Sequence, residues 1–228
     1  MKQKQINIFL VGDSTMAEYD ATRSPQTGWG QALHQYVTSQ VEIWNEAFPG
    51  RSSKSFFMEN RLERVENNIC TGDYLLIQFG HNDEKADPER HTDPFTSFQA
   101  YLKRYIATAR NNQAHAVLIT PVQRRSYDLS GNFQETHGDY PAAIKQLGAR
   151  LKVPVVDLAA ESRKLLEKLG PQLAKQLYLW LERGEEINYP DGLKDDTHFC
   201  QYGANMIAQL VVNELKTLNL PLTGYLKA

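Results

Sequence analysis

A serine, a histidine and a carboxylate in this chain have the types and spacing of a nucleophilic site. Ser14 follows a short apolar run, within Gly-Asp-Ser-Thr-Met-Ala at 12–17. A serine hydroxyl is a weak nucleophile until a base accepts its proton, so a histidine is also required. Of six histidines, His198 stands out because Asp195 precedes it by three residues. On a turn, that carboxylate can hold one imidazole nitrogen and leave the other to face Ser14.

Each of these residues also has an ordinary structural interpretation. Ser14 could cap the next helix or shape a turn, as serine often does. Asp195 and Asp196 could be solvated loop charges, and His198 a residue at a helix start. Asp196 also competes with Asp195 as the orienting carboxylate, and only the three-residue spacing favours Asp195.

Acyl transfer further needs hydrogen-bond donors for the negative oxygen of a tetrahedral intermediate. Gly50, in the stretch 45–53, would let the backbone approach a ligand and present its amide. Asn82, in Gly-His-Asn-Asp at 80–83, would present its side-chain amide. The alternatives are a simple turn at residues 49–50 and an Asx turn at Asn82.

The elements that must position these residues alternate between strands and helices, which predicts an α/β fold with a parallel sheet. Apolar runs rich in β-branched and aromatic residues predict five strands, at 6–11, 41–47, 74–79, 116–120 and 153–157. Three- and four-residue spacing predicts helices at about 30–38, 56–67, 95–110, 141–151, 159–169 and 204–215. With no repeat, linker or low-complexity stretch, we expect a single domain over 1–228.

The predicted strands place the candidate residues at one edge of the sheet. In open parallel sheets, ligands bind beyond the carboxyl ends of the strands, where the strand order reverses. Ser14, Gly50 and Asn82 each follow a predicted strand, and we expect Asp195 and His198 in a loop before the last helix. The polar and aromatic segment 170–194 is expected to combine a short helix with a loop over one sheet edge.

Composition excludes several classes of function. The 25 Lys and Arg against 27 Asp and Glu, a net charge of -2, give no basic field for nucleic acid. The 41% hydrophobic and 23% charged residues are ordinary globular values and do not indicate a membrane protein. Two cysteines, Cys70 and Cys200, cannot form a dense disulfide framework. The positive start and the short apolar run at 6–11 fall short of a signal peptide, so we expect a cytoplasmic protein.

With these residues in view, the chain resembles the SGNH, or GDSL-type, hydrolase superfamily. Four ordered blocks supply Ser14, Gly50, Asn82 and His198, and the last block's Asp-x-x-His pattern is met by Asp195. The stretches 12–17, 50–55 and 79–83 look most like the rhamnogalacturonan acetylesterases. The resemblance implies a three-layer flavodoxin-like fold, no metal or organic cofactor, and hydrolysis of O-acetyl esters on an acidic oligosaccharide. It also implies an oxyanion hole of the Ser14 and Gly50 amides with Asn82.

Substrate contacts and rival functions remain open at this point. Arg51 and Lys54 are candidates for substrate carboxylates, and Trp29, Tyr19 or Trp180 for stacking on sugar faces. The rivals are an esterase of the same mechanism acting on lipid, thioester or xylan, a metal-dependent phosphoesterase, and a non-catalytic sugar-binding module. Against the phosphoesterase, this chain lacks an early Asp-x-His block and does not have enough clustered His and Asp for two metals.

Overall fold

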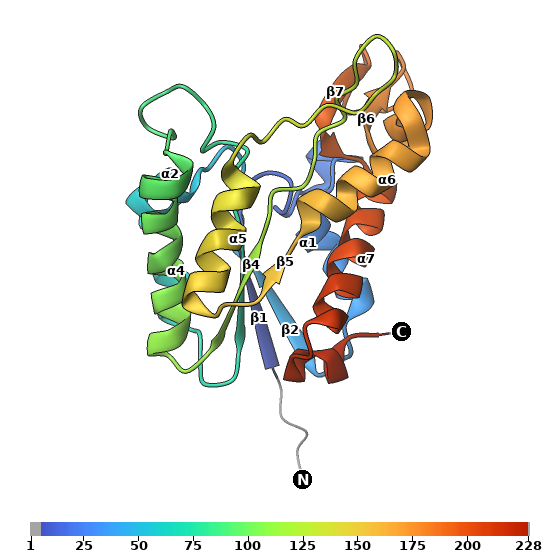
Figure 1. The fold of residues 1–228 in the computed structure, drawn as a ribbon. Coiled ribbons are helices and arrows are strands. Elements are labelled where there is room, and N and C mark those ends of the chain that lie inside the picture. Colours follow the sequence, from blue (N-terminus) through green and yellow to red (C-terminus); the bar gives the residue numbers. More distant parts are fainter. Residues whose placement is uncertain (1–5, 228) are drawn as a thin grey trace.

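The structure is a computed structural model that describes residues 6–227. Its centre is a sheet of five parallel strands in the order β2-β1-β3-β4-β5 (Figure 1). The strands are β1 (Ile6–Gly12), β2 (Val41–Asn45), β3 (Tyr74–Gln78), β4 (His115–Ile119) and β5 (Val155–Val156). The α/β fold and the five predicted strands are therefore confirmed. The strand order reverses between β1 and β3, so this pair defines the crevice in which a ligand is expected.

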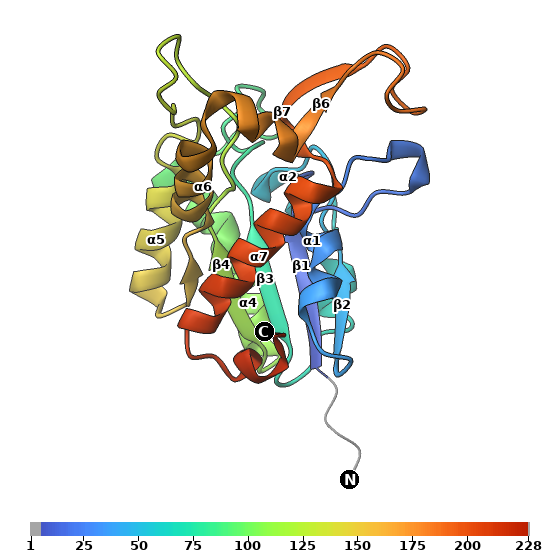
Figure 2. The same cartoon turned by 90° about the vertical axis from the view of Figure 1, so that its right-hand side faces the viewer.

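Helices cover both faces of the sheet and make three layers (Figures 1 and 2). One face carries α2 (Ser53–Met58), α3 (Glu63–Glu66), α4 (Gln99–Asn111) and α5 (Tyr140–Leu151); the other carries α1 (Trp29–Ala32), α6 (Leu158–Leu173) and α7 (Gln201–Thr217). Alternate residues of each strand point to opposite faces. Leu10 therefore packs in one hydrophobic core and its neighbour Phe9 in the other. The two cores hold the carboxyl ends of the strands in place.

Several predicted helices differ in detail from those observed. The helix expected at 56–67 is divided into α2 and α3, because Asn60 lies between them with φ +56°. The helix expected at 30–38 is a short α1 that continues as a 3-10 turn. The helix at 95–110 begins with a π turn before α4. The short turns are η1 (Ala21–Arg23), η2 (Leu33–Tyr36), η3 (Pro94–Phe98), η4 (Ala174–Leu177) and η5 (Pro221–Tyr225).

The segment 170–194 contains a strand that was not predicted. After a bend at Gly170, the chain forms η4 and then β6 (Tyr178–Leu181), which pairs antiparallel with β7 (Leu193–Phe199). This hairpin lies over the end of the main sheet (Figure 2). Asp195 and His198 therefore lie on a strand, and the expectation of a loop was wrong. The sequence of β7, Leu-Lys-Asp-Asp-Thr-His-Phe, gave no apolar alternation by which to recognise a strand.

Candidate active site

The turn after β1 presents Ser14 at the crevice. A Cβ on Gly12 would lie 2.7 Å from the carbonyl oxygen of Gln78, so only glycine lets β1 approach β3 this closely. The buried carboxylate of Asp13 accepts hydrogen bonds from the backbone N (2.9 Å) and Oγ1 (2.8 Å) of Thr15. It also contacts Nδ1 of His81 at 3.2 Å. These bonds fix the turn on both sides of the Ser14 hydroxyl.

The electrostatics beneath this turn fix two protonation states. Burial tends to raise the pKa of Asp13, but the charge and hydrogen bond of His81 and the bonds from Thr15 lower it below its ordinary value. Burial lowers the pKa of His81 to about 4. At neutral pH the pair is thus a carboxylate and a neutral imidazole, and the carboxylate can only accept, so Nδ1 of His81 carries the proton.

Ser14, His198 and Asp195 form a continuous hydrogen-bonded chain. The Ser14 hydroxyl lies 3.0 Å from Nε2 of His198, and Nδ1 of His198 lies 2.7 Å from Oδ2 of Asp195. Because a carboxylate only accepts, Nδ1 donates and Nε2 is left to accept the Ser14 proton. Burial opposes ionisation of Asp195, but hydrogen bonds and charge from His198 outweigh it and lower the pKa of Asp195. The arrangement is that of a nucleophile, a base and an orienting carboxylate.

Asp196 points away from this chain. Its Oδ1 accepts hydrogen bonds from Nη1 of Arg125 (2.6 Å) and Nε1 of Trp180 (2.7 Å). Successive residues of a strand face opposite sides. Because of this alternation along β7, Asp195 faces the imidazole of His198 and Asp196 faces the opposite side.

Three hydrogen-bond donors belong to residues that line the same cleft as the Ser14 hydroxyl. Within the described chain, the backbone N–H groups of Ser14 and Gly50 have no acceptor. Gly50 has φ +77°, a conformation that favours glycine, and nothing lies within 4 Å of a Cβ built there. Glycine at position 50 thus permits the turn, and the space beside its Cα is open. Nδ2 of Asn82 donates to the carbonyl of Arg51 at 3.1 Å and has a second hydrogen to offer.

These groups meet in a cleft of about 550 Å³ at the carboxyl ends of β1 and β3. Its lining residues are Ser14, Tyr19, Arg23, Gln26, Pro49, Gly50, His81, Asn82, Lys85, Arg124, Thr197 and His198. The sequence-predicted Ser14, Gly50, Asn82 and His198 therefore face one space. Tyr19, a candidate for sugar stacking, also lines it and donates from its hydroxyl to the carbonyl of Ser14 at 2.8 Å.

The other predicted substrate contacts lie outside this cleft. Arg51 and Lys54 line a neighbouring hollow of about 900 Å³, which shares Gly50 with the cleft. Arg51 pairs there with Glu59 at 2.8 Å, and Lys54 donates to the carbonyl of Pro88 at 2.6 Å. Both cations thus have partners within the chain.

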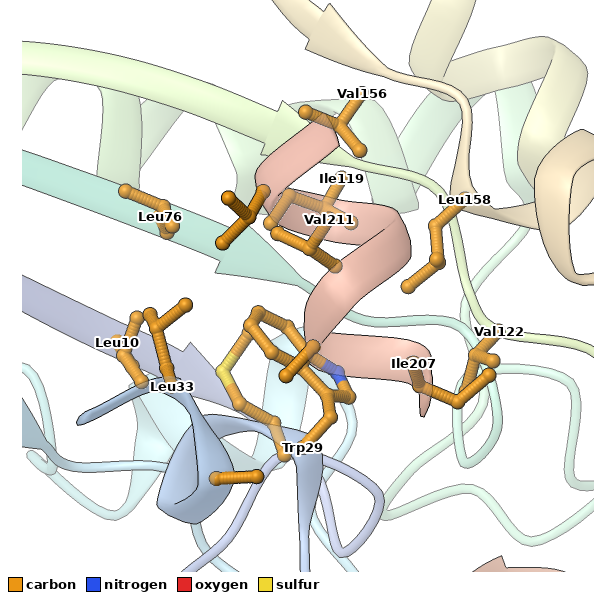
Figure 3. Close-up of a cluster of buried hydrophobic side chains, with 14 of the residues drawn as sticks. Leu10, Trp29, Leu33, Leu76, Ile119, Val122, Val156, Leu158, Ile207 and Val211 are labelled. Atoms are coloured by element: carbon orange, nitrogen blue, oxygen red, sulfur yellow. The ribbon is translucent and has the colours of Figure 1, made fainter. Parts of the chain in front are cut away.

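Trp29 cannot stack on a sugar. Its side chain is fully buried beside Leu33 and Ile207 (Figure 3), and its Nε1 donates to Oε1 of Gln78 at 2.8 Å. The expectation of a surface role was wrong, because the indole fills the core beside α7. Trp180 lies on the hairpin against the side chains of Arg125 and Lys175 and is not among the residues of the cleft.

Sequence reasoning missed three cations of the cleft, Arg23, Lys85 and Arg124. Two of them lie just after a strand, as the other candidates do. Lys85 shares a loop with Asn82, and Arg124 follows β4. Arg23 had no such signal, because the η1 turn reaches the cleft only through tertiary contacts.

A metal-dependent phosphoesterase would draw its ligands from the segments 80–83 and 195–198, and the histidines of both segments have other partners. His81 contacts Asp13, and His198 contacts Ser14 and Asp195. Within residues 6–227, no group of three or more His, Cys, Asp or Glu is placed to hold a metal ion. Across the same described positions, none of the helices has both the length and the apolar character needed to cross a membrane.

Sequence comparison finds a matching family and similar proteins. The sequence profile of the GDSL-like lipase/acylhydrolase family matches residues 10–204. The chain is 44% identical over 226 residues to the rhamnogalacturonan acetylesterase RhgT of Bacillus subtilis, covering 99% of this chain and 96% of that protein.

Solved structures share the fold. The crystal structure of the Bacillus subtilis protein YxiM superposes with a TM-score of 0.80 at 27% identity, covering 96% of this chain and 58% of that longer one. An acetylxylan esterase of Geobacillus stearothermophilus, Axe2, superposes with a TM-score of 0.65 at 18% identity, covering 94% of this chain and 96% of the other. At that identity the second likeness concerns the fold alone.

Proposed function

The chain belongs to the GDSL-like lipase/acylhydrolase family, and on that premise we propose that it is a serine esterase that removes O-acetyl groups from pectin-derived rhamnogalacturonan oligosaccharides. The observation that carries the proposal is the chain of hydrogen bonds from the Ser14 hydroxyl through His198 to Asp195 at the floor of an open cleft. The 44% identity to RhgT supports the choice of substrate.

In the proposed mechanism, Nε2 of His198 takes the Ser14 proton while Oγ attacks the acetyl carbonyl carbon. The carbonyl oxygen becomes negative and accepts hydrogen bonds from the Ser14 and Gly50 amides and from Nδ2 of Asn82. The tetrahedral intermediate collapses, the sugar oxygen leaves with the proton from His198, and an acetyl-enzyme remains. Water then attacks this ester by the same route and releases acetate.

Asp195 keeps the imidazole in the required tautomer throughout. Its lowered pKa means that it is ionised at neutral pH, so it stabilises the imidazolium that forms in each half of the reaction. No metal or organic cofactor takes part in the proposed steps.

Other parts of the proposal concern reach and location. An oligosaccharide that extends past Gly50 would enter the hollow lined by Arg51 and Lys54. We retain these two residues as contacts for a longer oligosaccharide. We also retain the cytoplasm as the proposed location; the apolar run at 6–11 is part of the folded domain, since it belongs to the strand that leads to Ser14. Residues 1–5 lie outside the described chain. A mature protein found outside the cell with a trimmed start would contradict this location.

Acetate release from acetylated rhamnogalacturonan, xylan and acyl-thioesters tests the function directly. We expect the highest kcat/KM on rhamnogalacturonan fragments, and a loss of at least about 10⁴-fold in Ser14→Ala. A serine-directed phosphonate should add its mass to the peptide that holds Ser14. Retained activity in Ser14→Ala, or labelling at another serine, would overturn the assignment of the nucleophile.

A further inference from the structure

Among the residues that the structure describes, those lining the cleft include three cations and no acidic side chain. Arg23, Lys85 and Arg124 all face it, whereas its other lining residues are neutral or histidine. The whole chain has a net charge of -2, so this cluster is a local feature and not a consequence of composition. Clefts lined by one sign of charge concentrate ligands of the opposite sign.

Arg124 is held rigidly at the wall of the cleft. Its guanidinium pairs with Glu84, and it donates from Nη2 to the carbonyl of His81 and from Nη1 to Oγ1 of Thr136, each at 3.3 Å. Glu84 is also shared with Nδ1 of His137 at 3.1 Å. An arginine has five donors, so two N–H groups of Arg124 remain for a ligand. A guanidinium fixed in this way loses little entropy when it binds a carboxylate.

Neither Lys85 nor Arg23 forms an ion pair within residues 6–227, although Asp20 lies near enough to Arg23 to feel its charge. Among the described residues, neither has a carboxylate within ion-pair distance, and Arg23 donates only to the neutral Oε1 of Gln26, from Nη2 at 2.9 Å and from Nε at 3.3 Å. The tip of the β6–β7 hairpin positions the turn that carries Arg23. Nδ2 of Asn188 donates to the carbonyls of Ala21 (2.9 Å) and Ser24 (2.8 Å). The hydroxyl of Tyr189 donates to the carbonyl of Arg23 at 3.2 Å.

We propose that Lys85, Arg23 and Arg124 form a carboxylate-binding subsite that selects a uronate residue next to the acetyl ester under attack. This inference rests on the proposed esterase function and assigns its specificity to three residues. It also separates these cations from Arg51 and Lys54, which line the neighbouring hollow and not the cleft that holds Ser14 and His198. Arg124 provides the fixed donors, and Lys85 and Arg23 close on the carboxylate from the rim.

Two matched substrates test the subsite. One is an O-acetylated uronate oligosaccharide, and the other is the same compound with its carboxylates reduced to alcohols. For the wild-type enzyme we expect kcat/KM to be at least about tenfold higher on the charged substrate, with the preference falling as salt is raised. Lys85→Met should lower kcat/KM on the charged substrate by about five- to tenfold and leave the neutral one within about twofold. The Lys85→Met/Arg23→Met double variant should lose most of the preference, chiefly through KM.

Control variants make the outcomes distinct. Lys103→Met, on the exposed side of α4, should change neither rate. Equal wild-type rates on the two substrates, or an equal loss on both in Lys85→Met, would overturn the subsite while the esterase function stands. Loss of the preference in Lys54→Met instead would move the carboxylate site to the neighbouring hollow and also overturn the assignment. Failure of the wild-type enzyme to release acetate from either substrate would instead contradict the proposed function.

Discussion

Asp195 and Asp196 are adjacent in the chain, yet they contact different partners. Asp195 accepts hydrogen bonds from Nδ1 and the backbone N of His198, at 2.7 and 3.0 Å. Asp196 accepts from Arg125 and Trp180 on the other side of β7. The three-residue spacing favoured the residue that lies against His198 in the structure, but the sequence had no means of showing why. The alternation of side chains along a strand is the physical reason.

This difference can be measured in two neighbouring variants. Asp195→Asn keeps the shape of the side chain but can favour the wrong imidazole tautomer, so we expect kcat to fall by about 10⁴-fold. Asp196→Asn leaves the imidazole untouched, and its kcat should stay within about tenfold of wild type. Circular dichroism would check that both variants fold. A larger loss in Asp196→Asn than in Asp195→Asn would reverse the two roles.

At the scale of secondary-structure elements, the loops after β2 and β3 are joined through one buried carboxylate. Asp83 follows Asn82, and it accepts hydrogen bonds from the backbone N (3.0 Å) and Oγ (2.5 Å) of Ser53 and from Oγ1 of Thr92 (2.9 Å). Ser53 begins α2, three residues after Gly50. The bond therefore fixes the distance between the two loops that supply the proposed oxyanion donors.

Asp83→Asn should disturb this link and change how stability depends on pH. Burial raises the pKa of Asp83 to about 7, against an ordinary value near 4. Between these values the native state holds a proton that the unfolded state has lost, so this group makes the native state less stable as pH rises, by up to about 1.4 kcal/mol per pH unit. The variant should lack this contribution, and its kcat should fall about tenfold or more. Urea unfolding at pH 5 and 7.5 measures the free energy of unfolding of both proteins. If the difference in this free energy between wild type and variant is the same at both pH values, the assignment to Asp83 is contradicted.

At the scale of the whole molecule, the hairpin is attached to the α/β body through α7. A Cβ on Gly203 would lie 1.8 Å from the carbonyl oxygen of Leu177 in η4, just before β6. The backbones of the last helix and of the segment that leads into the hairpin thus touch directly. His198 is positioned by the hairpin and Ser14 by the sheet, so this contact contributes to the alignment of the two.

Gly203→Ala should therefore destabilise the protein although alanine favours helices. Forcing a methyl group against backbone costs about 1–3 kcal/mol, and the gain in helix propensity offsets at most about 1 kcal/mol of it. We expect a lower urea midpoint and a lower kcat. Gly224→Ala is the control, because nothing lies within 4 Å of a Cβ at that position. Equal stability of the two variants would show that the contact relaxes without cost.

The sequence predicted the sheet well because its strands are buried runs of apolar residues, as in β3, where every residue is buried. It predicted Ser14, Gly50 and Asn82 as residues of one site because each follows such a strand. The hairpin, the turn carrying Arg23 and the burial of Trp29 were not predictable in this way. They depend on contacts between distant segments, such as the bond from Tyr189 to Arg23, 166 residues apart.

The hydroxyl and the imidazole that meet at the floor of the cleft are separated by 184 residues. During synthesis on a ribosome, Ser14 emerges before His198, so a growing chain carries no activated serine until β7 has been made. Fragments that end before β7 would hold the amino-terminal strands of the sheet and still be inert. Activity thus requires that synthesis has passed β7, which carries the base.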